Sequence, residues 1–365
     1  MTTPTPPPPP GAALLPTADR GGPAQPLLAV RQLVKHFPVR DPFWVRPRRA
    51  VHAVDGVSFE VAKGETLGIV GESGCGKSTT ARLVARLLAP DAGKLVFDGE
   101  GVAEFGGVSL RDYRRGLQMV FQDSFASLNP RMTVEDTIAF GPRVHGVGAA
   151  AALARAHDLL ERVGLRAAQF AARYPHELSG GQRQRVNIAR ALALEPRLLI
   201  LDEAVAALDK SVQAQVLNLL QALKAEHALT YIFISHDLHV VHYLCDRVMV
   251  MYLGQVVEVG PVEQIYAAAR HPYTQALLSA VPSMDPARRT TRAPLAGDPP
   301  NPISPPGGCR FRDRCPKAEA VCAAAAPLLA AWSAQAAHEV ACHMAVAGSG
   351  HSAAPAVASP ARVAA

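Results

Sequence analysis

Residues 66–78 read TLGIV-GESGCGKS, and this stretch decides the fold. Residues 66–70 form a short, continuous apolar run, which is typical of a strand buried on both faces. Residues 71–78 match the pattern G-x-x-x-x-G-K-[ST], and a helix is expected directly after it, over residues 77–88. The glycines let successive backbone N–H groups turn inward around phosphate oxygens, and the helix N-terminus adds positive potential. The sequence therefore predicts a phosphate-binding loop.

The side chains of this loop have separate expected roles. Lys77 is expected to reach the β- and γ-phosphates of a bound nucleotide, and Ser78 to ligate Mg²⁺. A chance match is the alternative, but a strand before the loop and a helix after it are the context that a functional loop requires. The expected nucleotide contacts come from Gly71, Glu72, Ser73, Gly74, Cys75, Gly76, Lys77, Ser78 and Thr79.

Apolar runs alternate with helical patterns along the middle of the chain. Further buried strands are expected at residues 117–121, 198–202 and 231–235. Helices are expected at residues 150–163, 181–194 and 212–223, and a hairpin at residues 247–260 with its turn at Gly254. This alternation predicts an α/β core around a parallel sheet.

The composition permits a large folded core. Of the 365 residues, 49% are hydrophobic and 19% are charged, which excludes global disorder. The net charge of +6 permits an anionic partner and requires none. Residues 1–26 and 345–365 are expected to be disordered, and the proline-rich residues 282–308 to connect two domains. No basic leader precedes Asp19 and no stretch makes a good membrane span, so we expect a soluble, cytoplasmic protein.

Two acids end the apolar run at residues 198–202. Asp202 suits a Mg²⁺ shell, and Glu203 is placed to polarise an attacking water. A strand that ends in acids is often only a helix-capping loop, but a phosphate loop in the same chain favours the functional interpretation.

Residues 178–182 read LSGGQ and describe a second anion site. Ser179, Gly180 and Gly181 offer a hydroxyl and backbone N–H groups at a helix start, although a purely structural cap is the alternative. The stretch resembles the signature of ABC transporter ATPases. That resemblance implies that Ser179 closes on the γ-phosphate held by a partner subunit. It also implies a RecA-like P-loop NTPase core, at residues 27–260, with an ABC-type helical subdomain at about 124–181.

The same resemblance assigns four more residues. Gln122 resembles the Q-loop glutamine, which senses Mg²⁺ and water, and Asp209 resembles the D-loop aspartate. His236 resembles the switch histidine, which contacts the γ-phosphate. Phe37 is the expected adenine-stacking aromatic, with Phe43, Trp44 or a plain core role for Phe37 as alternatives.

Several stretches narrow the resemblance to the oligopeptide/dipeptide and nickel-peptide importers. These are residues 71–76, 121–131, 211–215 and 271–274. Cys75 in the loop, the SLNPRMTV stretch at 127–134 and the insertion at 41–49 are more similar to an F-type subunit than to a D-type subunit. The chain departs from the family at Ala204, Ala206 and Lys210, which puts D-loop signalling between two sites in doubt.

The resemblance implies ATP and Mg²⁺ as ligands and a defined set of partners. These are a paralogous D-type ATPase, two transmembrane permeases and an extracytoplasmic peptide-binding protein, with this subunit at the cytoplasmic face of the inner membrane. A soluble ABC ATPase acting on nucleic acid or ribosomes is the alternative. One cassette in the chain and no long insertion between its motifs count against it, and we expect no nucleic acid partner. A non-hydrolysing regulatory subunit is a third interpretation, which Glu203 and His236 oppose.

Four late cysteines, Cys309, Cys315, Cys322 and Cys342, lie in a C-terminal extension at residues 261–344. Cytosolic thiols stay reduced, so a metal is favoured over disulfides. The spacings lack the close pair of a zinc knuckle, and we expect a [4Fe–4S] cluster, with zinc or no metal as alternatives. The cargo stays open between peptides, nickel chelates and other solutes.

Overall fold

The computed structural model describes residues 22, 25–39, 49–281, 297, 300–332 and 338–355. Most of the expected N-terminal arm, most of the 41–49 insertion and residues 282–296 lie outside the described residues. In the described part of the chain, no helix is both long and apolar enough to cross a membrane.

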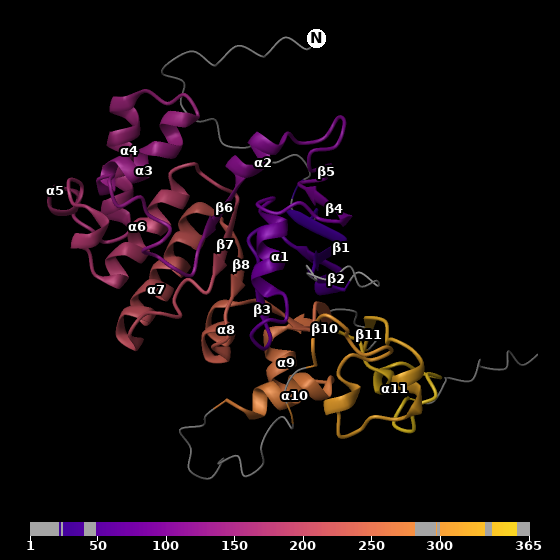
Figure 1. Cartoon of the computed structure of the whole chain (residues 1–365). Helices are drawn as coiled ribbons and strands as arrows, with labels where there is room; N and C mark the ends of the chain where they lie inside the picture. The colour runs from indigo at the N-terminus through magenta and orange to yellow at the C-terminus, as the bar shows by residue number, and fades with distance from the viewer. Residues whose placement is uncertain are drawn as a thin grey trace, which may run out of the picture.

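A sheet of mainly parallel strands forms the centre of the molecule (Figure 1). Its strand order is β11-β12-β10-β9-β3-β8-β7-β6, and the five strands from β9 to β6 are parallel. The predicted parallel core is therefore confirmed. Its strands are β3 (Thr66–Val70), β6 (Leu117–Val120), β7 (Leu198–Asp202), β8 (Thr230–Ile234) and β9 (Arg247–Tyr252). Nearly all of their residues are buried, since helices or other strands cover both faces.

The antiparallel additions to this sheet come from the C-terminal third of the chain. The predicted hairpin joins β9 to β10 (Gln255–Pro261), and Gly254 in its turn has a φ of 80°. Two short strands from the extension, β11 (Ala330–Ala331) and β12 (Glu339–Val340), continue the sheet beside β10.

A second, antiparallel sheet packs over the phosphate-loop helix. Its order is β2-β1-β4-β5, from β1 (Leu28–Pro38), β2 (Ala50–Val61), β4 (Ala92–Phe97) and β5 (Glu100–Gly101). Figure 1 shows this sheet on one side of α1 (Lys77–Val84) and the parallel strands on the other. Helix α1 is shorter than the expected 77–88, because Arg86 takes a left-handed φ of 54° that ends it.

Three further helices adjoin the core strands: the first precedes β6, and the other two follow β7 and β8. They are α2 (Leu110–Gly116), α7 (Lys210–His227) and α8 (Leu238–Leu244). A separate helical group lies at the left of Figure 1, on the far side of the parallel sheet from α1. It contains α3 (Val134–Val144), α4 (Ala149–Arg162), α5 (Ala167–Phe170), the 3-10 turn Pro175–Glu177 and α6 (Gly180–Leu192).

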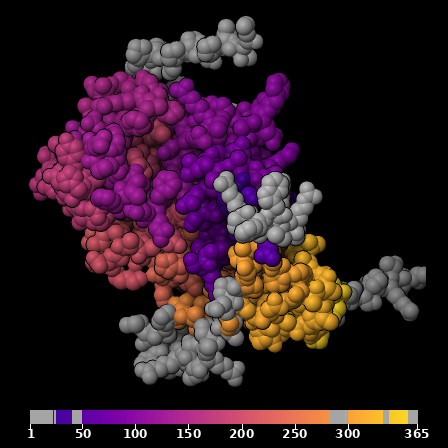
Figure 2. All heavy atoms as spheres, in the orientation of Figure 1, coloured from indigo at the N-terminus to yellow at the C-terminus, as the bar shows by residue number. Residues whose placement is uncertain are grey.

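The C-terminal extension forms a lobe beside the N-terminal strands, drawn in yellow in Figure 2. It is reached through α9 (Val262–Ala268) and α10 (Pro272–Ser279). Its remaining elements are the 3-10 turns Arg312–Arg314 and His343–Ala345 and helix α11 (Ala320–Ala324).

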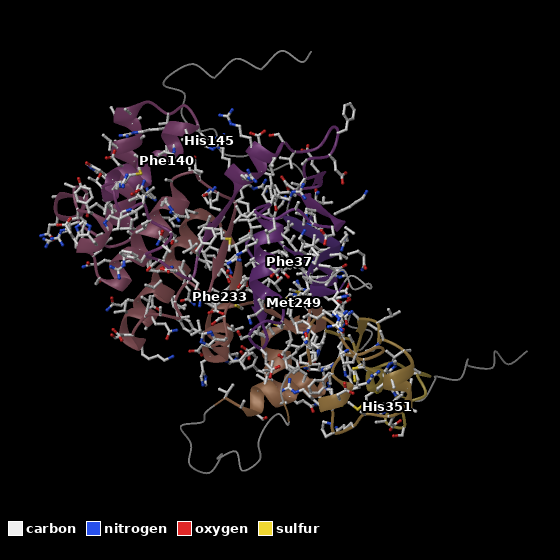
Figure 3. The ribbon with its side chains drawn as sticks, viewed as in Figure 1. Phe37, Phe140, His145, Phe233, Met249 and His351 are labelled. Carbon is white, nitrogen blue, oxygen red and sulfur yellow. The ribbon has the colours of Figure 1, made fainter. Side chains whose placement is uncertain are left out.

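The extension reaches further than the composition predicted. Residues 345–355, assigned above to a disordered tail, fold onto it: His351, labelled in Figure 3, is buried, and its Nε2 lies 2.9 Å from the Lys317 carbonyl oxygen. The Ser352 N–H donates to Glu319 at 2.9 Å. The predicted tail was too long because a biased composition does not reveal such distant partners.

Candidate functional site

The phosphate loop wraps around the ammonium group of Lys77. Its Nζ donates to the carbonyl oxygens of Gly71 and Glu72 at 2.7 and 3.0 Å, and only 6% of the residue is exposed. Gly71 and Gly76 have φ values of 147° and 109°, and a Cβ on Gly76 would lie 2.2 Å from the carbonyl oxygen of Ala53 in β2. A residue with a Cβ would not fit at positions 71 and 76. The two glycines therefore allow the loop backbone to close around the Lys77 ammonium group.

A hydroxyl and a carboxylate form an oxygen pair at the start of α1. The Ser78 Oγ donates to Asp202 Oδ1 at 2.9 Å, across the gap between α1 and the end of β7. Burial raises the pKa of Asp202, although the Ser78 hydrogen bond opposes the shift. Two oxygen ligands from facing elements are what Mg²⁺ accepts in nucleotide sites, so these residues fit the expected ion.

The carboxylate of Glu203 is the meeting point of three segments. Gln122, just after β6, donates its Nε2 to Glu203 Oε2 at 2.8 Å, and His236 Nδ1 lies 3.5 Å from the same oxygen. Glu203 itself has a left-handed φ of 49°, and its N–H donates to the Ile234 carbonyl oxygen at 3.0 Å. A non-glycine residue in this conformation is strained, and such strain is typical of functional sites.

The LSGGQ stretch starts α6 on the other side of the parallel sheet. Ser179 is the N-cap, and it exchanges hydrogen bonds with Gln182 in a capping box. Gly181 lies against the start of α7, where a Cβ would meet Val212 Cγ1 at 2.4 Å. Among the described residues, no hydrogen bond links residues 179–181 to residues 71–78. Figure 1 shows α6 and α1, the helices that follow the two anion sites, on opposite sides of the parallel strands.

Comparisons with known proteins agree with this geometry. Residues 54–206 match the ABC transporter family model, and residues 257–322 match the model of the oligopeptide/dipeptide transporter C-terminal region. A protein of Brucella ovis described as a peptide import ATP-binding protein is 51% identical over 83% of this chain and 94% of its own length. This chain belongs to the ATP-binding proteins of ABC transporters.

Other relatives of this ABC protein carry similar descriptions. The oligopeptide transport ATP-binding protein AppF of Bacillus subtilis is 48% identical over 87% of this chain and 97% of its own length. Among solved structures, cbiO1 of Clostridium perfringens, part of an ABC transporter complex, is 29% identical with a TM-score of 0.57, covering 67% of this chain and 91% of its own. A dimeric ATP-binding cassette with ADP and Pi bound, in a post-hydrolysis state, is 25% identical with a TM-score of 0.55, covering 64% and 98%. The chain is thus an ATPase subunit with the expected P-loop core.

The departures from the ABC pattern lie close to the Glu203 site. Ala204 is buried and Ala206 is exposed, while the Lys210 ammonium donates to Asp237 Oδ2 at 2.8 Å. Burial alone would raise the pKa of Asp237, but Lys210 and two backbone N–H groups outweigh it, and the net pKa lies below its usual value. The unusual lysine therefore ties the start of α7 to the residue after His236. Asp209, at the N-cap of α7, is exposed and makes no side-chain capping bond.

Phe37 lies near the end of β1, opposite Val51 of β2, and is labelled in Figure 3. It is 36% exposed, and the Lys35 ammonium lies 5.7 Å from the centre of its ring. Ala53, two residues after Val51, lies against Gly76 of the phosphate loop, so the strand paired with Phe37 reaches this loop. The alternatives Phe43 and Trp44 lie outside the described residues.

The four late cysteines line one small cavity in the extension. Burial raises the pKa of the Cys342 thiol to about 11, and the other three sulfurs add to the shift, so the four thiols lie near one another. A single Zn²⁺ with four thiolates would hold the sulfurs about 3.8 Å apart. In the described residues, only His36, His52 and Asp55 place three ligand atoms within 4.8 Å of one another. Four thiols that line one cavity are a donor set of either a [4Fe–4S] cluster or a Zn²⁺ ion, so their chemistry fits both groups.

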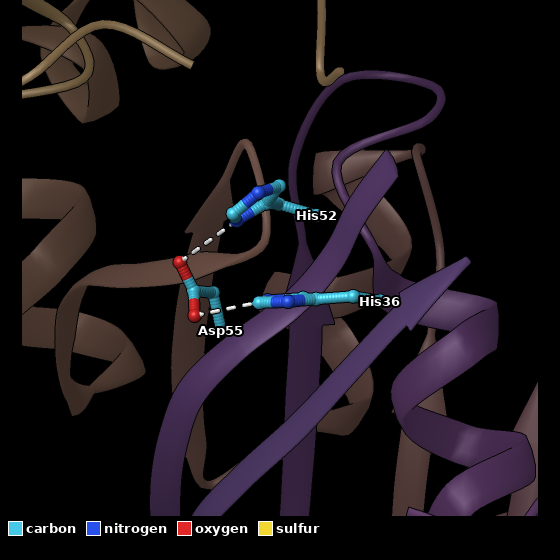
Figure 4. A group of neighbouring side chains, drawn as sticks. All are labelled: His36, His52 and Asp55. Atoms are coloured by element: carbon cyan, nitrogen blue, oxygen red, sulfur yellow. Dashed lines mark hydrogen bonds and ion pairs between the residues drawn. The ribbon is translucent and has the colours of Figure 1, made fainter. Parts of the chain in front are cut away.

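His36, His52 and Asp55 form a group on the paired strands β1 and β2 (Figure 4). Asp55 lies 3.2 Å from His36 Nε2 and 3.5 Å from His52 Nδ1, and it also accepts a hydrogen bond from Arg310. Burial would raise the pKa of Asp55, but Arg310 and the two histidines bring it below its usual value. Since Arg310 already balances this carboxylate, we interpret the group as a hydrogen-bonded contact.

Two residues that the sequence analysis missed contact the phosphate loop directly. The Glu72 N–H donates to the Tyr273 hydroxyl at 2.8 Å, and the Glu72 carboxylate pairs with Arg314. Tyr273 belongs to the 271–274 stretch, whose sequence indicated only the resemblance to peptide importers. No local signal pairs Arg314 with a residue 242 positions away.

Proposed function

We propose that this chain hydrolyses ATP to drive the import of peptides by an ABC transporter. The observation that carries the proposal is the Glu203 carboxylate, held by Gln122 and His236 at the end of β7, in a chain whose relatives are described as peptide import ATP-binding proteins. Dipeptides and nickel chelates are alternative substrates for a transporter powered by this subunit.

In this proposal each part of the site has one task. The loop of residues 71–79 and Lys77 bind the phosphates, and Ser78 and Asp202, with Gln122, hold Mg²⁺, which neutralises developing charge when bound. Glu203 takes a proton from the attacking water, because it is the carboxylate that Gln122 and His236 hold next to Asp202 at the end of β7. His236 orients the γ-phosphate, Phe37 stacks on adenine, and Asp209 communicates between the two sites.

The separation of the two anion sites supports a dimeric mechanism. Ser179, Gly180 and Gly181 would close on ATP held by a second subunit, since in this chain they lie across the sheet from its own loop. We propose a D-type ATPase as that partner, two permeases that receive the movement through the Gln122 segment, and an extracytoplasmic binding protein. The subunit would sit peripherally at the cytoplasmic face of the inner membrane.

We expect this subunit alone to hydrolyse ATP slowly. Its phosphate loop lacks an opposing signature, and losing a preorganised anion contact costs about a hundredfold in rate. The measurement compares turnover of the purified subunit with turnover of the assembled transporter. Full activity of the subunit alone, with a dimer in solution, would instead mean that it pairs with itself.

Uptake in cells tests the cargo. A strain lacking this subunit should lose uptake of labelled di- and oligopeptides, and plasmid-borne wild-type protein should restore it. Loss of nickel accumulation with normal peptide uptake would contradict the peptide proposal.

We also propose that Cys309, Cys315, Cys322 and Cys342 hold a [4Fe–4S] cluster with a structural or redox-sensing role. After anaerobic purification we expect about four iron and four acid-labile sulfide per chain. Replacing the four cysteines by serine should remove both, while Cys245→Ser, in a buried core cysteine, should remove neither. Stoichiometric zinc without sulfide would rule out the cluster.

A further inference from the structure

The turn between Cys309 and Cys315 reaches out of the extension and onto the phosphate loop. Arg314 donates from its two terminal nitrogens to the two carboxylate oxygens of Glu72, at 2.8 and 3.0 Å. Its side chain is only 6% exposed, and the Tyr252 hydroxyl lies 3.4 Å from one of these nitrogens. A buried, two-pronged arginine–carboxylate pair fixes both orientation and charge.

Aromatic packing holds this turn in place. Phe311 lies between Tyr252 and Tyr273, with ring centres 5.3 and 5.5 Å away. The Tyr273 hydroxyl in turn accepts the Glu72 N–H at 2.8 Å. Both the backbone and the side chain of Glu72 are therefore held by residues that lie C-terminal to the nucleotide-binding core.

The charge of Glu72 is a liability in a loop that binds a polyanion. Its carboxylate belongs to the segment whose carbonyl oxygens hold Lys77, and its field reaches the loop interior. After burial and the opposing effect of Lys77, the charge of Glu72 contributes to raising the pKa of the Cys75 thiol. A bare carboxylate here would repel the phosphates of an incoming nucleotide.

We propose that Arg314 is a positioning residue for ATP binding, which neutralises Glu72 and holds the phosphate loop in its open, phosphate-accepting form. Through Arg314, the cysteine-bearing extension sets the nucleotide affinity of the core. The proposal rests on the assignment of residues 71–78 to phosphate binding, which Lys77→Ala tests separately.

The test compares three variants in the assembled transporter and in the isolated full-length subunit. Arg314→Met should raise the KM for MgATP, and the Kd for a fluorescent ATP analogue, about tenfold, the scale of an uncompensated charge near a partly buried ligand, with kcat little changed. High salt should shrink the defect, because the Glu72 carboxylate is partly open to solvent and its charge is screened. Arg312→Met is the matched control, because in the described part of the chain the Arg312 side chain bonds to Asp313 and Gly307 of its own segment and not to the phosphate loop.

The double variant Glu72→Gln/Arg314→Met separates electrostatics from folding. We expect it to restore KM to within about twofold of wild type, because the repelling charge has gone. A KM that stays tenfold high in the double variant, or a normal KM in Arg314→Met, would overturn the proposal.

Should Arg314→Met fail to fold, two single variants test the same idea. Arg314→Lys keeps the positive charge and should stay within about threefold of the wild-type KM. Glu72→Gln alone should lower the KM, because it removes a negative charge from the loop that binds the phosphates. A large rise in KM in Glu72→Gln would contradict the neutralising role. Lys77→Ala tests the phosphate-loop assignment alone. If Lys77→Ala loses nucleotide binding while Arg314→Met has a normal KM, the loop assignment stands and the role proposed for Arg314 is wrong.

Discussion

Glu203→Gln should bind MgATP normally and lose at least about a hundredfold in turnover, because the attacking water loses its base. The amide keeps the size of the side chain and can still interact with Gln122 and His236, so the site should stay assembled. Single-turnover hydrolysis in the assembled transporter, beside equilibrium binding of a nucleotide analogue, measures the two effects separately.

A matched carboxylate variant controls for the loss of charge alone. Glu226→Gln removes an exposed carboxylate of α7 that pairs with Arg162, and it should leave turnover unchanged. Near-normal turnover by Glu203→Gln would remove Glu203 from the role of base and direct attention to Asp202, its neighbour on β7.

Lys77→Ala should lower the affinity for MgATP itself by about a hundredfold, since a charge-assisted hydrogen bond contributes about 1.5–3 kcal/mol. The buried ammonium is the only lysine nitrogen described inside the loop, where it donates to Gly71 and Glu72. Titration of the purified subunit with a fluorescent ATP analogue provides the measurement.

The control for this second experiment is Lys94→Ala, an exposed lysine on β4. It should bind nucleotide as wild type does. Equal affinity for ATP in Lys77→Ala and wild type, with both proteins melting at the same temperature, would contradict the phosphate-loop assignment and with it the placement of the site.

Patterns confined to a few adjacent residues were predictable from the sequence. The phosphate loop follows from glycines that alone accept the φ values of residues 71 and 76, and from the strand and helix that flank them. The buried strands β3, β7 and β8 follow from continuous apolar runs, because parallel strands covered on both faces need no polar side. The two acids at the end of β7 were visible in the sequence, whereas the role of His236 after β8 was expected only from the family resemblance.

What joins distant segments was decided only by the tertiary structure. Nothing near Glu72 or Arg314 in the sequence indicates that they pair, nor that Lys210 would bind Asp237. The folded residues 345–355 were missed because they are held by contacts with distant residues: His351 contacts the Lys317 carbonyl oxygen, and Ser352 donates to Glu319. Their own composition does not indicate these contacts. The end of α1 was misplaced because the left-handed Arg86 opposes an apolar pattern that continues through Leu88. Local propensity is a property of neighbours along the chain, whereas an ion pair or a packed tail depends on which segments the fold brings together.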